Sequence, residues 1–349
     1  TSTAYNYLEA DPLNYPRYYN TINQQEVANK IKLLEWGEHG LVFSSGLAAI
    51  TTTLMTLLKE GDHAIFQGDI YGGTHYANTS ALSKFGIAFS FTENMEVGSL
   101  EKLIQPNTKL VYVETPSNPL LKIVDLAGIA RLSKAHGFYS VIDNTFASPI
   151  NQRPLEHGID VVTHSGTKYL GGHSDLTCGA VVTSADIGNK IYKTAVNLGG
   201  SLDPQSCYLL DRSLKTLAIR VRQQNDNALQ IAHTLSESEK IEAVYYPGLA
   251  THPGHKIAKQ QMNGFGAMLS FEVMGDADSF VKILALIKPA ISLGGVESTI
   301  SSPEQTSHAK LSPEQRQEAG IKPNLLRLSV GNEDVYDLPQ DLQQAKEQL

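Results

Sequence analysis

Short apolar runs alternate with helix-like segments between residues 40 and 184, and this alternation restricts the possible folds of the 349-residue chain more than any other feature. The runs are rich in β-branched residues, as is typical of strands that are buried on both faces. They read HAIFQ, IAFSF, KLVYVET, YSVIDNT, DVVTHS and GAVVTS. Between them lie GLAAITTTLMTLLKEG, LAGIARLSKAHG and IGNKIYKTAVNLGG, which have helical spacing and end on glycine. The pattern predicts an α/β fold with a mostly parallel sheet.

The rest of the sequence predicts an N-terminal arm, a connecting helix and a second domain beside this one. A helical stretch begins near residue 204, and AVYYP, AMLSFEV, ISLGG and LLRLSVG then mix with helical segments, which indicates a smaller α+β domain. The first residues are tyrosine-rich and irregular before a helix begins near Asn23. Because the first residue is Thr1 rather than methionine, we expect a truncated N-terminal arm. The expected parts are the arm at 1–39, a large domain at 40–205, a long connecting helix at 206–240 and a C-terminal domain at 241–349.

The charge balance and the cysteine content narrow the class of protein. The chain has 28 Lys and Arg against 36 Asp and Glu, whereas nucleic-acid and membrane-surface partners favour a basic face. No apolar run reaches the roughly 18 residues of a membrane-spanning helix, and no signal-peptide pattern is present. Cys178 and Cys207 are too few for a disulfide framework or a zinc site, so no metal is predicted. These features predict a cytoplasmic enzyme that acts on a small molecule.

Ligands of an open parallel sheet bind at the carboxyl ends of its strands, so the residues that follow each predicted strand are the candidates for a site. Ser45 and Gly46 in VFSSGLAAI begin a helix, where free N–H groups favour an anion, although the same pattern occurs in an ordinary serine cap. No G-x-G-x-x-G and no nucleoside-triphosphate loop follows a strand, which argues against a nucleotide.

The later strands end in groups of complementary chemistry. YSVID ends on Asp143, ETPSNP places Asn118 between two prolines, and HSGTKYLGG contains Ser165, Thr167 and Lys168. Pyridoxal phosphate requires a cradle for its phosphate, a carboxylate for its protonated ring nitrogen and a lysine that forms a Schiff base with its aldehyde. The occurrence of these groups together, in this order along the chain, predicts pyridoxal 5′-phosphate as the cofactor.

Several longer motifs resemble those of a known family. They are SSGLAAI, DIYGGT, ETPSNP, IDNTFASP, HSGTKYLGGHSD, SLGGVES and LRLSVG, and the match extends from TST at the start to LRLSVGNEDVYDL near the end. The chain resembles the Cys/Met metabolism, or trans-sulfuration, family of pyridoxal-phosphate enzymes, which includes cystathionine γ-synthase, the cystathionine lyases and methionine γ-lyase. The resemblance implies fold type I, the aspartate-aminotransferase-like architecture, with a large domain and a smaller C-terminal α+β domain.

The resemblance also implies roles for individual residues. Lys168 is expected to bind the cofactor covalently and to act as the catalytic base, and Asp143 is expected to hold the ring nitrogen. Asn118 is expected to contact the ring hydroxyl and the substrate. Tyr71 is expected to stack on the ring and to relay protons as a second catalytic residue. The residues expected around the phosphate are Ser45, Gly46, Leu47, Ser165 and Thr167.

Substrate and subunit contacts follow from the same resemblance. Arg327 of LRLSVG and Ser292 of SLGG are expected to bind the substrate carboxylate, for which an arginine fork is well suited. Tyr15 and Arg17 of YPRYYNT match the family's Y-x-R element, which reaches the phosphate of the neighbouring subunit. That match implies a homotetramer built from two active dimers.

Two positions bear on the reaction and favour different members of the family. Ile291 is apolar, as in methionine γ-lyases, where relatives that act on cystathionine often have glutamate. Gly73 resembles the cystathionine enzymes, since methionine γ-lyases usually have cysteine there. We predict a carbon–sulfur lyase that performs β- or γ-elimination on substrates of the cystathionine, cysteine or methionine type. The alternative within the family is γ-replacement on an acyl-homoserine, as in cystathionine γ-synthase.

Functions from other classes are weaker candidates. An NAD-dependent oxidoreductase can use the same parallel sheet, but the glycine fingerprint is missing. A non-catalytic cofactor-binding protein has no need for Lys168, Tyr71 and Arg327 together. Aminotransferases are close in fold, but SGTKYLGGHSD and SLGGVES resemble the sulfur-amino-acid enzymes.

Overall fold

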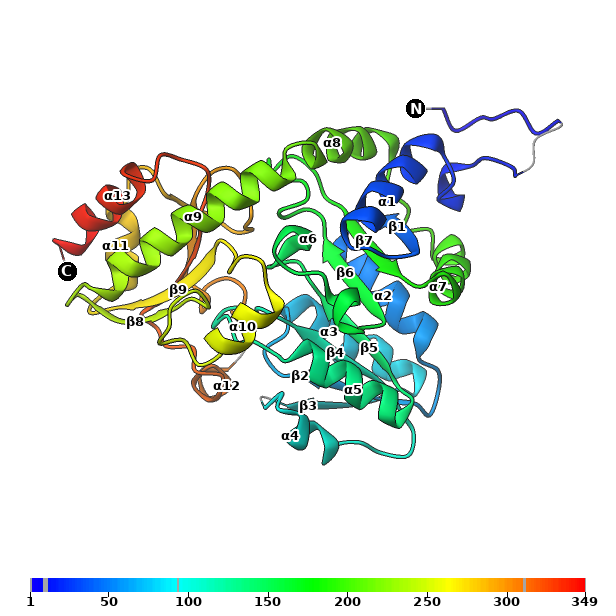
Figure 1. Ribbon diagram of the computed structural model, residues 1–349, viewed down its shortest axis with the longest axis horizontal. Helices are drawn as coiled ribbons and strands as arrows, with labels where there is room; N and C mark the ends of the chain where they lie inside the picture. The colour runs from blue at the N-terminus through cyan, green and yellow to red at the C-terminus, as the bar shows by residue number, and fades with distance from the viewer. Residues whose placement is uncertain (1, 9–11, 93, 310–311, 349) are drawn as a thin grey trace.

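Two β-sheets organise the computed structural model, which describes residues 2–8, 12–92, 94–309 and 312–348 (Figure 1). Within these residues the larger sheet has the strand order β1-β7-β6-β5-β4-β2-β3. Neighbours among β2 to β6 pair in parallel, whereas β7 is antiparallel to both β6 and β1. The strands are β1 His39–Phe43, β2 His63–Gln67, β3 Ala88–Thr92, β4 Thr108–Glu114, β5 Tyr139–Asp143, β6 Val161–Ser165 and β7 Gly179–Thr183. The predicted α/β class with a mostly parallel sheet is confirmed.

Helices cover both faces of this sheet. They are α1 Ile22–Leu34, α2 Gly46–Leu57, α3 Gly72–Ser80, α4 Val97–Glu101, α5 Leu126–His136, α6 Ser148–Asn151 and α7 Ala185–Leu198, with 3₁₀ turns at Pro16–Tyr18, Leu82–Phe85 and Pro154–His157. Residues of α2 and α7 share an apolar cluster with one face of the sheet, and residues of α1 and α5 share clusters with the other. Burial on both faces explains why the central strands read as continuous apolar runs.

The C-terminal part forms the smaller sheet, at the opposite end of the molecule from the N-terminal arm (Figure 1). Its strands are β8 Ile241–Tyr245, β9 Met268–Val273, β10 Lys288–Pro289, β11 Thr299–Ser301 and β12 Leu325–Ser329. Its helices are α9 Leu217–Ser236, α10 His255–Gln261, α11 Ala277–Ile283, α12 Pro313–Glu318 and α13 Asp337–Lys346. α8 Pro204–Leu214 lies beside α1 instead, where Asp211 pairs with Lys30 (Figure 1). The described strands run β10-β11-β12-β9-β8, and α9, α11 and α13 contribute Leu235, Phe280 and Leu342 to the cluster that also contains Phe271 of β9.

The connecting helix expected at 206–240 is instead two helices, α8 and α9, with a break at Lys215 and Thr216. At the break the carbonyl group of Ser213 accepts hydrogen bonds from Nη2 of Arg220 at 3.0 Å and from Oγ1 of Thr216 at 3.2 Å. Side chains thus satisfy a carbonyl at a helix end, which helical periodicity alone does not reveal. In the described part of the chain, no helix combines the length and the apolarity needed to cross a membrane.

The segment ISLGG, expected among the strands of the smaller domain, forms a loop. Ser292 in this loop has a φ of 80°, and Gly294 has a φ of 73°. Two left-handed residues interrupt the extended backbone that a strand requires, so the segment bends toward the larger sheet instead of joining the smaller one.

Candidate active site

The ends of three neighbouring parallel strands surround Lys168. β4, β5 and β6 end at Glu114, Asp143 and Ser165. Lys168 lies in the turn that follows β6, where its N–H donates to the carbonyl group of Ser165 at 3.1 Å. Because β4, β5 and β6 are parallel neighbours, their carboxyl ends lie at one edge of the sheet, as a ligand site of this architecture requires.

The Lys168 side chain extends from this edge to the C-terminal part of the chain. Its Nζ donates to Oγ of Ser292 at 2.7 Å. Arg327 on β12 donates from Nη1 to Oδ1 of Asn118 at 2.8 Å and from Nη2 to the carbonyl group of Ser292 at 3.4 Å. The structure therefore brings together Lys168, Asn118, Ser292 and Arg327, which belong to four separate segments of the sequence.

The surroundings of Lys168 favour a reactive amine. Burial and the charge of Arg327 lower the pKa of Lys168 to about 8, and the negative charge of Asp143 offsets part of that shift. A substantial fraction of such an amine is neutral near pH 8, so it can serve as a nucleophile and as a base. This chemistry accounts for a lysine between two apolar strands.

Arg327 is a buried guanidinium group that has unused hydrogen-bonding capacity. Burial lowers its pKa to about 10, and within the described residues its Nε has no hydrogen-bond partner. A buried donor of positive charge is stabilised by an anion, and the guanidinium fork matches a carboxylate. The position of Arg327 beside Lys168 therefore suits the carboxylate of an amino-acid substrate.

Asp143 presents a buried carboxyl group at the end of β5. Burial raises its pKa, whereas hydrogen bonds from Thr145 lower it. The N–H of Thr145 donates to Oδ1 of Asp143 at 3.0 Å. A cation placed against this carboxyl group stabilises its ionised form, and the protonated ring nitrogen of pyridoxal phosphate is such a cation. The residues present thus fit the ring end of the predicted cofactor.

The start of α2 has the free N–H groups of an anion site. Ser45 is the N-cap, its Oγ accepts the N–H of Ala48 at 3.1 Å, and Gly46 and Leu47 are the first helical residues. A Cβ atom at position 46 would lie 2.7 Å from Cβ of Ser165, so glycine is needed for this close approach of α2 to β6. The arrangement fits a phosphate group.

Thr167, also expected at the phosphate, makes different contacts in this structure. Its Oγ1 donates to the carbonyl group of Cys178 at 3.2 Å and accepts the N–H of Cys178 at 3.0 Å. These two bonds join the ends of the loop from 167 to 178. The hydroxyl group of Thr167 therefore holds the loop that follows Lys168, and Cys178 is a buried free thiol, as expected for an inert cysteine.

Tyr71 is the N-cap residue of α3, and its side chain is 48% exposed. Its N–H donates to Oε1 of Glu114 at 2.8 Å, which connects the start of α3 to the end of β4. A Cβ atom at position 73 would overlap the ring of Tyr71, so Gly73 leaves room for this ring orientation. The phenol is accessible, as a ring that stacks on a cofactor must be.

Tyr15 and Arg17 lie on the N-terminal arm, apart from the Lys168 group, which consists of Lys168, Asn118, Ser292 and Arg327. Nη1 of Arg17 donates to the carbonyl group of Val196 in α7 at 2.7 Å, and its guanidinium lies 4.9 Å from the ring centre of Tyr18. Tyr15 is 42% exposed and also packs against Tyr18. Within the described residues, the hydrogen bonds of this arm do not reach Lys168, Asp143 or Arg327.

Two residues at the strand ends were missed by sequence reasoning. Glu114 binds the N–H of Tyr71, and Oγ1 of Thr145 accepts the N–H of Ser165 at 2.7 Å. Both lie inside two of the family-like motifs, ETPSNP and IDNTFASP. Their position directly at or after a strand end was the available signal, because that edge of a parallel sheet carries the site.

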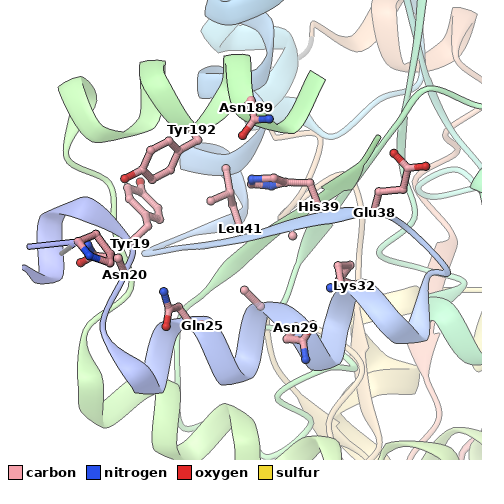
Figure 2. Close-up of a pocket in the computed structure, with 13 residues that line it drawn as sticks. Tyr19, Asn20, Gln25, Asn29, Lys32, Glu38, His39, Leu41, Asn189 and Tyr192 are labelled. Carbon is pink, nitrogen blue, oxygen red and sulfur yellow. The ribbon is translucent and has the colours of Figure 1, made fainter. Parts of the chain in front are cut away.

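A hollow of about 430 Å³ lies between α1, β1 and α7, away from Lys168 (Figure 2). Polar and apolar residues both line it, among them Lys32, Glu38, Leu41 and Asn189. None of the predicted site residues lines it. This hollow is therefore separate from the residues that the sequence predicts for the site.

The model of the Cys/Met metabolism PLP-dependent enzyme family matches residues 1–347. The chain belongs to this family. It is 44% identical over 337 residues to cystathionine γ-lyase of Bacillus subtilis, covering 95% of this chain and 89% of that relative. It is 45% identical to cystathionine β-lyase of Lactococcus lactis subsp. cremoris, covering 90% of this chain and 83% of that relative. It is 42% identical to L-methionine γ-lyase of Fusobacterium nucleatum, covering 92% of this chain and 83% of that relative.

Solved structures of the same family have closely similar folds. Cystathionine γ-lyase from Lactobacillus plantarum, complexed with L-serine, matches with a TM-score of 0.95 and 41% identity, covering 99% of this chain and 91% of that one. Cystathionine γ-synthase from Xanthomonas oryzae pv. oryzae, in complex with aminoacrylate and cysteine, matches with a TM-score of 0.95 and 39% identity over the same shares. The predicted family, fold type I and dependence on pyridoxal phosphate are confirmed, and the predicted enzyme class agrees with the lyases among these relatives.

Proposed function

We propose that the protein is a pyridoxal-phosphate-dependent carbon–sulfur lyase that performs β- or γ-elimination on sulfur amino acids. The observation that carries this proposal is the contact of the Lys168 amine with Ser292, directly beside the Arg327 guanidinium. A base and a carboxylate-binding group at this spacing act on the carbon next to an amino-acid carboxylate. Relatives that are lyases for cystathionine and methionine support the same reaction class.

Residues at the sheet edge would hold the cofactor. Asp143 would bind its ring nitrogen, Asn118 its ring hydroxyl and Lys168 its aldehyde carbon. Ser45, Gly46, Leu47 and Ser165 would bind its phosphate, together with Thr167 once its hydroxyl group is released from Cys178. When bound, pyridoxal phosphate supplies an electron sink that makes the α-proton of the substrate acidic.

Lys168 performs the proton transfers on the carbon skeleton in this proposal. Nζ takes the α-proton, and for a leaving group on the γ-carbon it takes a second proton from the β-carbon. The pKa of about 8 permits both roles, because the amine can accept a proton and release it again near neutral pH. Arg327 and Ser292 hold the substrate carboxylate and so keep the α-carbon facing Nζ. Tyr71 donates a proton to the departing sulfur from its phenol oxygen.

The second candidate is γ-replacement on an acyl-homoserine, which the likeness to cystathionine γ-synthase supports. Both reactions use the same cofactor residues and differ in whether cysteine or water ends the cycle. Ile291 favours elimination from a substrate with an apolar distal end, such as methionine, since this side chain next to Ser292 offers no hydrogen bond to a distal polar group.

The test is a substrate screen of the purified holoenzyme with cystathionine, methionine, cysteine and O-acyl-homoserine plus cysteine. We expect keto acid from at least one of the first three substrates. The Lys168→Ala variant should release none, and the exposed-lysine variant Lys240→Ala should behave as wild type. Thioether formation from acyl-homoserine without keto acid would identify the replacement reaction instead, and amino-group exchange with a keto acid as the main activity would identify an aminotransferase.

We further propose a homotetramer built from two active dimers, in which Tyr15 and Arg17 of each arm bind the phosphate of the partner subunit. Support comes from the exposed position of Tyr15, apart from its own Lys168 group. Light scattering gives the assembly, and Arg17→Ala should weaken cofactor retention without changing the fold. A monomer that retains pyridoxal phosphate normally would refute this assembly.

The expected division of the chain at residues 39, 205 and 240 stays a proposal, to be tested by limited proteolysis. We also propose a cytoplasmic location, in keeping with the two buried free cysteines, Cys178 and Cys207. Cell fractionation tests the location directly.

A further inference from the structure

Glu114 is a buried acid beside the residues assigned above, and it has no part in the proposed reaction. It ends β4 and is 5% exposed. Its Oε1 accepts the N–H of Tyr71 at 2.8 Å, and its own N–H donates to Oε1 of Gln67 at 3.0 Å. Since Tyr71 is the N-cap of α3, this side chain connects the start of the helix to the end of β4.

Glu114 also lies beside Asp143. The two residues are register partners in the parallel pair of β4 and β5, so their side chains leave the sheet on the same face. Asp69 approaches from the segment that follows β2 and is held by Gln67, Ser117 and, at 3.6 Å, the Lys122 ammonium. Three carboxyl groups thus share one buried region, where simultaneous ionisation of neighbours is costly.

The surroundings of Glu114 and Asp143 differ in which charge state they support. Burial raises the pKa of Glu114 well above its usual range, the charges of Asp143 and Asp69 raise it further, and the N–H of Tyr71 opposes them. Burial raises the pKa of Asp143 too, but Thr145, His164 and Tyr112 all lower it. The surroundings therefore favour the ionised form at Asp143 and the neutral form at Glu114.

We propose that Glu114 is a positioning residue that works as a neutral carboxylic acid. One of its oxygen atoms fixes Tyr71 through the backbone N–H, and its neutrality leaves Asp143 as the anionic member of the pair at the cofactor ring. The inference rests on the proposed function, since it assigns Glu114 a role through Tyr71, the proton donor to the leaving sulfur.

The test compares Glu114→Ala, Glu114→Gln, Tyr71→Phe and the double variant Glu114→Ala/Tyr71→Phe as holoenzymes. Alanine removes the acceptor, so we expect kcat to fall about tenfold with a smaller change in KM, because a displaced catalytic group slows chemistry more than binding. Glutamine is neutral and retains a carbonyl acceptor, so it should restore kcat and leave the pH profile unchanged. In the Tyr71→Phe background, Glu114→Ala should add less than about a twofold loss.

A second readout does not depend on turnover. Hydrogen exchange at the start of α3, measured by mass spectrometry, should be faster in Glu114→Ala than in wild type and close to wild type in Glu114→Gln. The matched control is Glu272→Gln, another buried glutamate, which accepts hydrogen bonds from Tyr245 and Lys322 in the smaller domain. Glu272→Gln should change neither hydrogen exchange in α3 nor the values of kcat and KM.

Three results would overturn the proposal. Glutamine could impair kcat as strongly as alanine, alanine could slow Tyr71→Phe as much as it slows wild type, or exchange in α3 could be unchanged in Glu114→Ala. A wild-type enzyme that eliminates no sulfur amino acid refutes the proposed function instead, and the exchange measurement still tests the contact of Glu114 with Tyr71.

Discussion

The two sides of the site are built from different kinds of structure. On the cofactor side, Asp143 is 9% exposed and ends a central strand that is paired on both edges. On the substrate side, Ser292 has a φ of 80° in a loop, and its neighbour Ile291 is 77% exposed. Strand ends of a packed sheet hold side chains rigidly, whereas an exposed loop can change its side chains at little cost to the core. In the proposed site, the cofactor chemistry thus depends on the strand ends of the sheet, and the choice of substrate depends on the exposed loop.

The largest expected effect is on the cofactor side. Lys168→Ala removes both the covalent attachment and the base, so turnover should fall by about 10⁴-fold or more. Borohydride reduction followed by peptide mass spectrometry should find pyridoxyl-lysine at 168 in wild type and none in the variant. Normal turnover by Lys168→Ala would remove the basis of the comparison.

Asp143→Asn should have the next largest effect. An amide cannot supply the negative charge that keeps the ring nitrogen protonated, so kcat should fall about 100-fold while the cofactor stays attached through Lys168. The control is Asp203→Asn, since Asp203 caps α8 away from the site. Steady-state kinetics measures kcat, and the absorbance of the bound cofactor measures its attachment. An Asp143→Asn variant as fast as wild type would contradict the role of Asp143.

The two sides of the site interact electrostatically, because the charge of Arg327 lowers the pKa of Lys168. In the apoprotein, reaction of this amine with an amine-reactive reagent should rise about tenfold per pH unit below its pKa of about 8 and level off above it. Ordinary surface lysines keep gaining reactivity beyond pH 10. Arg327→Met removes a positive charge, so the midpoint should move to higher pH, as peptide-resolved labelling can measure. An unchanged midpoint would show that Arg327 does not act on Lys168.

The smallest effect is expected on the substrate loop. Ile291→Glu offers a hydrogen-bond acceptor to a polar distal group, so the ratio of kcat/KM for cystathionine to that for methionine should rise several-fold. The cofactor spectrum should stay as in wild type, because Ile291 is exposed and lies outside the sheet. A change in cofactor binding instead would mean that the loop and the sheet are not separable.

Sequence patterns predicted the large sheet well and the connections less well. β2 matches the predicted run HAIFQ, and the ends of β4, β6 and β7 lie within one residue of theirs, because buried parallel strands are short continuous apolar runs. β5 begins where YSVIDNT begins and ends two residues earlier. β1 was missed, since HGLVF contains a glycine and, among the described strands, is an edge strand that pairs with β7. The break between α8 and α9 was missed because Arg220 stabilises it from a distance.

Within the site, too, residues in local sequence patterns could be predicted, whereas roles that depend on distant contacts could not. Asp143 and Lys168 could be found because they lie at or just after the end of a recognisable strand, and Ser45 because it stands at the start of a recognisable helical run. Glu114 could not be separated from the other acids, because its role depends on the N–H of Tyr71, 43 residues away in the sequence. The hydroxyl group of Thr167 binds Cys178 rather than an open anion site, a contact that only the folded loop creates.

The sequence by itself determined the alternation of strands and helices and the chemistry at the end of each strand, because periodicity and turn residues report the local surroundings of the backbone. The tertiary structure decided which of these groups act together. Lys168 meets Ser292 across 124 residues, and Asn118 meets Arg327 across 209. Contacts at such separations arise from the packing of two whole sheets, and no local pattern encodes them.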